Sequence, residues 1–97
     1  MGLADAERKE LEVLVKAASR DPRVAIGLAR QMVPPQGDLE EFAYGLISGM
    51  IIGSFMASFE RRNGRPLDRD ENTEILTIMM NRMSLLRKAI MKQLDMR

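Results

Sequence analysis

The chain has 97 residues, 45% of them hydrophobic, and its 15 basic and 14 acidic side chains leave a formal net charge of +1. It contains no cysteine and no histidine, which excludes disulfide frameworks, zinc–thiolate sites and catalysis by a cysteine or a histidine. The basic excess is too small to indicate a nucleic-acid partner by itself.

The length suits a single domain over residues 1–97. Size scaling gives a compact chain of this mass roughly 5,600 Å² of exposed surface. The apolar residues are mainly Leu, Ile, Met and Ala, which favour helices, and no segment has a strand pattern. We therefore predict an all-α fold. The first residues lack the apolar core of a secretion signal, and we expect a cytoplasmic protein.

The first two predicted helices cover residues 3–19 and 22–33. The first has an apolar face formed by Leu11, Leu14, Val15 and Ala18. Asp21 and Pro22 are typical of an N-cap and a first helical residue. The second helix is expected to bury Val24, Leu28 and Met32 and to end at the Pro34-Pro35 pair.

The third and fourth predicted helices cover residues 39–63 and 69–95. Asp38 and Asp68 are each followed three residues later by a glutamate, a pattern typical of a capping box. Gly64 is a natural C-terminal cap of the third helix, and Pro66 prevents its continuation. The last helix carries a continuous apolar seam of Leu76, Met79, Met83, Leu86, Ile90 and Leu94.

A strip of small residues is the most distinctive feature of the third helix. No charge occurs between Phe42 and Phe59, and positions four apart hold Gly45, Gly49, Gly53 and Ala57. Such positions stack on one face of a helix. The strip can pack against a helix of the same chain, most simply the C-terminal one, or against a second copy of the chain. As a third interpretation it belongs to a transmembrane span, where small residues mediate helix association.

The remaining faces of the third helix are also apolar, and such a helix has to be surrounded. Three further helices, two of them with limited apolar faces, scarcely enclose it in a monomer of this size. We therefore predict a bundle of about four antiparallel helices, completed by dimerisation with the strip as the interface. The transmembrane interpretation is less favoured, because 18 residues span about 27 Å and the run is diluted by glycine and serine.

No cluster of side chains indicates catalysis. The serines of the third helix lie in an apolar helix without an adjacent base. The acidic cluster that begins at Asp68 resembles a calcium loop but has Thr73 and Met79 where glycine and glutamate are required. We predict no enzyme activity, no metal and no cofactor.

Two further surfaces are candidates for partners. Ile75, Met80 and Met91 lie off the main seam of the last helix and form a candidate protein-binding surface. Basic residues around the third connection are candidate phosphate contacts: Arg61, Arg62, Arg65 and Arg69. No aromatic side chain lies among these arginines to stack on bases.

The sequence thus predicts a small non-enzymatic helical protein that acts through homo-oligomerisation and protein–protein interaction, as an adaptor, regulator or assembly subunit. The alternative is a nucleic-acid-associated protein that uses the basic 61–69 loop and the C-terminal helix. A small membrane-associated protein is the third hypothesis.

Overall fold

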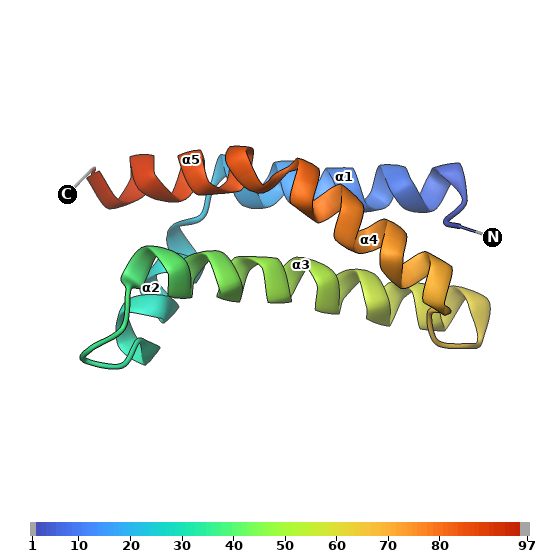
Figure 1. The fold of residues 1–97 in the computed structure, drawn as a ribbon, viewed down its shortest axis with the longest axis horizontal. Coiled ribbons are helices and arrows are strands. Elements are labelled where there is room, and N and C mark those ends of the chain that lie inside the picture. Colours follow the sequence, from blue (N-terminus) through green and yellow to red (C-terminus); the bar gives the residue numbers. More distant parts are fainter. Residues whose placement is uncertain (1, 96–97) are drawn as a thin grey trace.

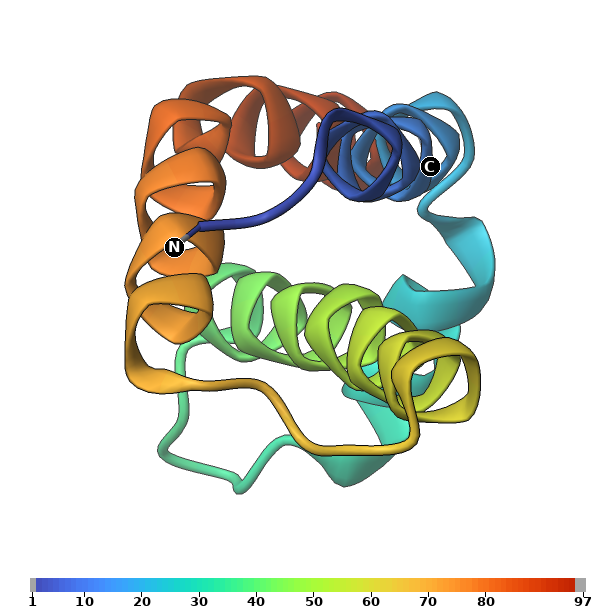
Figure 2. The same cartoon turned by 90° about the vertical axis from the view of Figure 1, so that its right-hand side faces the viewer.

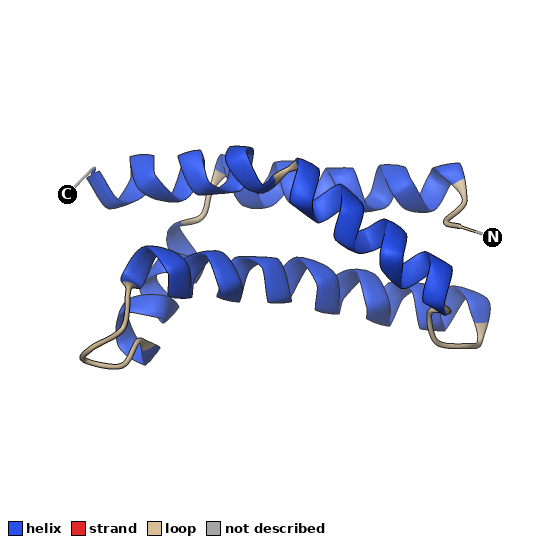
Figure 3. Ribbon diagram, in the orientation of Figure 1, coloured by secondary structure: helices blue, strands red, loops and turns tan. Residues whose placement is uncertain are grey.

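The computed structural model describes residues 2–95 and is all-helical, with no strand in that part of the chain (Figures 1 and 3). Five helices follow one another, one more than the four predicted. Their bounds are α1 Asp5–Arg20, α2 Arg23–Met32, α3 Leu39–Asn63, α4 Arg69–Asn81 and α5 Met83–Asp95.

The helices form an elongated two-layer arrangement of 43 × 22 × 19 Å. α1 and α5 lie side by side and form the upper layer, while α3 forms the lower layer (Figures 1 and 2). The short α2 packs on the N-terminal half of α3, and α4 crosses from the end of α3 to the start of α5. α3 is therefore covered by α1, α2 and α5.

Asp38 and Asp68 cap α3 and α4 as predicted, although the reciprocal contact of a full capping box forms only in α4. The Asp38 carboxylate accepts from the backbone N–H of Glu41 at 3.3 Å, and the Asp68 carboxylate accepts from the N–H of Glu71 at 2.8 Å. Gly64 caps α3 in the left-handed conformation with φ 66°, which glycine adopts at no steric cost. α1 begins at Asp5, two residues later than predicted, because Leu3 lies before the helix, where its side chain is buried and its backbone N–H donates to Glu74 at 2.8 Å.

The core is built from rows of apolar side chains. On α3 the buried residues occur at every fourth position: Ala43, Ile47, Ile51, Phe55 and Phe59. On α1 the predicted face is confirmed, since Leu11 and Val15 are buried and Leu14 and Ala18 pack against the core. The burial of these rows fixes the relative rotation of α1 and α3.

The predicted inner face of α2 is wrong. Val24, Leu28 and Met32 are 73%, 43% and 58% exposed. The buried residues are instead Ala25, Ile26 and Ala29. The two alanines let α2 approach α3 closely, and this contact turns the row of larger side chains outwards.

The predicted single helix 69–95 is also wrong, because the chain breaks at Arg82 with φ −102° and ψ 3°. α5 follows α1, whereas α4 has to turn away to reach the end of α3 (Figure 1). The side chains that face the core therefore differ in part from the predicted apolar seam. Met79, Leu86 and Ile90 are buried as expected, but Leu76 is exposed and Ile75 takes its place in the core.

Candidate interaction surface

The glycine strip lies on the side of α3 that no helix of the chain covers. Gly45 follows the buried Ala43 by two residues, which is a rotation of about 200° around the helix. Gly49, Gly53 and Ala57 repeat this offset, and all four residues are exposed. A Cβ atom added at any of the three glycines would have no neighbour within 4 Å. The strip therefore makes no packing contact within the chain.

Two ridges of larger apolar residues border the strip. Leu46 and Met50 lie on one side of it, and Ile52 and Met56 lie on the other, as the four-residue spacing requires. Met50 is 47% exposed and Met56 is 38% exposed. The outer side of α3 is thus an uncharged face with a shallow glycine-lined groove along its middle.

The exposed row of α2 extends this face. Val24 and Met50 line the same small cavity of about 120 Å³, together with Ile47 of α3. The row Val24, Leu28 and Met32 therefore begins next to the ridge that carries Met50. We call the glycine strip, its two ridges and the α2 row together the α2–α3 face.

The chain as a whole exposes more surface than a compact monomer of its size. The chain exposes 6544 Å², about 900 Å² more than the roughly 5,600 Å² of a compact protein of its mass. Its Cα radius of gyration is 14.3 Å, compared with about 12.5 Å for a compact chain of this length.

α3 is long and apolar enough to cross a membrane, and 28% of its most apolar window is buried. α1 and α5 lie along α3 (Figure 1). A bilayer around α3 would therefore also have to accommodate the charged outer residues of both neighbours, such as Lys9, Lys16 and Lys88, at a high cost per charge.

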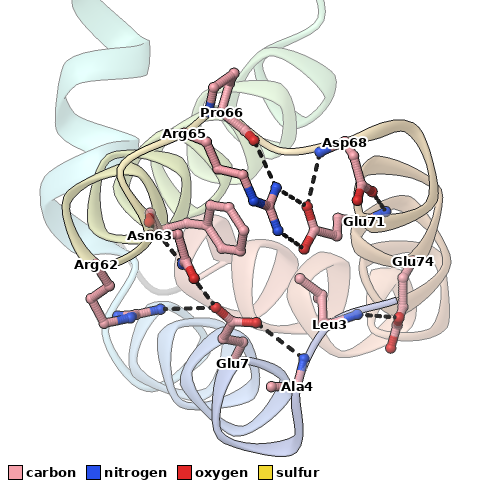
Figure 4. A network of polar contacts seen from close by, with 11 residues as sticks. Leu3, Ala4, Glu7, Arg62, Asn63, Arg65, Pro66, Asp68, Glu71 and Glu74 are labelled. Carbon is pink, nitrogen blue, oxygen red and sulfur yellow. Dashed lines mark hydrogen bonds and ion pairs between the residues drawn. The ribbon is translucent and has the colours of Figure 1, made fainter. Parts of the chain in front are cut away.

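Two of the four candidate phosphate contacts are bound to carboxylates. Arg65 pairs with Glu71 through Nη1–Oε1 at 2.8 Å and Nη2–Oε2 at 3.0 Å. Arg62 donates to Glu10 at 2.5 Å. It also lies 3.8 Å from Glu7 (Figure 4). These carboxylates neutralise the arginines locally.

Arg61 and Arg69, the other two candidates, are exposed. Arg61 lies in the last turn of α3 and Arg69 is the first residue of α4.

The second candidate partner surface is incomplete in the structure. Ile75 is only 2% exposed and belongs to the core. Met80 on α4 is 67% exposed and Met91 on α5 is 45% exposed. The break at Arg82 separates the two methionines onto different helices, so the predicted continuous surface does not form.

The acidic residues and the serines were the remaining candidates for chemistry. No group of three or more Asp or Glu residues that could hold a metal occurs within residues 2–95. The Ser58 hydroxyl accepts a hydrogen bond from Arg62 at 2.6 Å, and the Ser48 hydroxyl is buried without a partner among the described residues. Neither serine has a base beside it to activate it.

No protein-family model, no curated protein and no solved structure matches the chain. The functional argument therefore depends on the geometry of the α2–α3 face. The sequence pointed to the strip, but it missed the α2 row, because the row has the same four-residue spacing that an inner face would have.

Proposed function

We propose that this protein is a small non-enzymatic helical protein that acts by self-association and protein–protein contact, as an adaptor, regulator or assembly subunit. The observation that carries the proposal is the exposed, uncharged α2–α3 face. Monomeric proteins rarely expose apolar patches of more than a few hundred Å², and larger ones mark interaction sites.

Light scattering of the purified chain at several concentrations tests the proposal. We expect a mass of about 22 kDa, twice that of the 11.0 kDa chain, in the absence of detergent. A mass that stays near 11 kDa up to high concentration would contradict self-association.

Replacing a glycine of the strip sharpens this test. A Cβ atom at Gly49 would have no neighbour within 4 Å in its own chain, so in Gly49→Leu the fold should persist while the mass falls towards that of one chain. Ala17→Leu is the matched control, because Ala17 is an exposed small residue of α1, outside the α2–α3 face. An unchanged mass in the Gly49 variant would exclude the strip as a contact.

The nucleic-acid alternative is weakened by the ion pairs of Arg62 and Arg65. It predicts retention on DNA or RNA that falls steeply with salt and falls further in the Arg61→Ala, Arg69→Ala double variant. We expect no such retention at physiological ionic strength.

A further inference from the structure

We propose that the occupant of the α2–α3 face is a second copy of this chain, with the two α3 helices crossing antiparallel at Gly49 about a twofold axis. This inference rests on the proposed function and specifies its partner and its geometry.

The first support is the area. The surface in excess of a compact monomer is about 900 Å², and a standard protein–protein interface buries about 800 Å² on each partner. The excess of the whole chain is therefore of the size that one such interface covers on each partner.

The second support is the absence of charge. A twofold contact places a residue near the axis against the same residue of the partner, so a charge there would meet its own sign. α3 has no charge from Phe42 to Phe59. The α3 part of the face is therefore compatible with itself.

The shape of α3 defines how two copies meet. The strip is a groove along an i±4 row, and its borders are i±4 ridges, which favours helix crossing at about −50°. Gly49 is the middle glycine, so a crossing there brings Gly45 of one copy towards Gly53 of the other. The missing side chains allow the two backbones to approach closely.

The ends of α3 decide between the two directions. Asp38, Glu40 and Glu41 lie at its start, and Arg61 and Arg62 lie at its end. Glu41 and Arg62 already pair within the chain, which leaves Asp38 and Arg61 exposed. An antiparallel crossing brings these opposite ends, and the opposite ends of the helix dipoles, nearer to each other.

α2 supplies the wall of the interface in this arrangement. It packs beside the N-terminal half of α3, and an antiparallel partner presents the C-terminal half of its own α3 at that place. The row of Val24, Leu28 and Met32 would then lie along the partner near its Ala57.

Cross-linking of single cysteines tests the pairing cleanly, because the native chain has none. Met50→Cys places a thiol next to the crossing point. Met91→Cys is the matched control, since Met91 is 45% exposed and Met50 is 47% exposed, and Met91 lies on α5. With a short bismaleimide we expect covalent dimer to form at least ten-fold faster at position 50. Equal rates would overturn the pairing.

The direction is tested by mixing two variants, Gly45→Cys and Gly53→Cys. Antiparallel crossing predicts that the mixed 45–53 product exceeds both symmetric products several-fold. A predominance of the 45–45 and 53–53 products would overturn the antiparallel arrangement.

The mass measurement separates the two levels of the proposal. A dimeric mass without cross-linking at position 50 overturns this pairing and leaves self-association standing. A monomeric mass overturns both, and flotation of that monomer with neutral phosphatidylcholine vesicles would assign the face to lipid instead.

Discussion

Glu71 accepts two hydrogen bonds from the guanidinium of Arg65, at 2.8 and 3.0 Å, and this pair closes the connection between α3 and α4. The same carboxylate accepts from the backbone N–H of Asp68 at 2.9 Å (Figure 4). The Arg65 guanidinium also lies 5.0 Å from the centre of the Phe59 ring. Glu71 is only 4% exposed. Its contacts connect the loop with the start of α4 and, through Arg65, with Phe59 near the C-terminal end of α3.

The first prediction concerns this carboxylate. Glu71→Gln removes the charge that Arg65 and the Asp68 N–H are oriented around, and it should lower the free energy of unfolding by about 1–3 kcal/mol. Urea denaturation followed by circular dichroism measures the change.

Arg69→Ala is the control for that experiment. Arg69 is exposed at the start of α4, and its removal should change the free energy of unfolding by less than about 0.5 kcal/mol. Equal effects of the two substitutions would show that Glu71 contributes no more than a surface residue does.

The second prediction is a dependence on acid. The hydrogen bonds from Arg65, together with that from Asp68, lower the pKa of Glu71 from 4.5 to about 2. A carboxylate with a depressed pKa in the folded state stabilises fully above its unfolded pKa and loses this effect as pH falls towards the folded value. The difference in unfolding free energy between the native chain and Glu71→Gln should therefore shrink between pH 5 and pH 2. A difference that is constant over this range would contradict the role of the charge.

Much of the fold could be predicted from the sequence because local chemistry fixes the helix ends. Asp38, Asp68 and Gly64 act through groups within three or four residues of themselves, and such caps do not depend on the rest of the chain. The uncharged run of α3 also marked the candidate surface directly.

The two wrong predictions, the buried face of α2 and the unbroken last helix, concern features that depend on tertiary contacts. α2 has apolar residues on two adjacent sides, and only its packing on α3 selects Ala25 and Ala29 over Val24 and Leu28. The sequence around the break at Arg82 contains no proline or glycine that would predict it. Arg82 donates to the Glu12 carboxylate of α1 through Nε at 2.8 Å, a contact between residues far apart in the sequence.

The third prediction is that alanine at position 49 stabilises the isolated chain but weakens its self-association. Gly49→Ala gains helix propensity and meets no neighbour within the chain, so it should stabilise the isolated fold by about 0.8–1 kcal/mol. At the crossing point the added methyl group separates the two backbones and should weaken self-association. Thermal denaturation at low concentration and sedimentation equilibrium measure the two effects.

Gly27→Ala serves as the reference for that variant. It should give the same gain in stability, because a Cβ atom added at Gly27 of α2 also has no neighbour within 4 Å in the chain. Tighter association of Gly49→Ala than of the native chain would contradict close backbone packing at the strip.

The fourth prediction tests the contribution of α2 to the α2–α3 face. Leu28 is 43% exposed, so Leu28→Lys keeps the core intact and leaves the free energy of unfolding within about 0.5 kcal/mol of the native value. In the dimer the ammonium group of the lysine would be buried among apolar side chains. Burial of an unpaired charge is costly. We expect the dissociation constant of the dimer to rise at least ten-fold, measured by sedimentation equilibrium.

Leu76→Lys is the matched substitution on α4, where the leucine is 58% exposed, and it should leave the dissociation constant unchanged. If both lysines weaken association equally, the effect comes from net charge and the α2 row has no specific place in the interface.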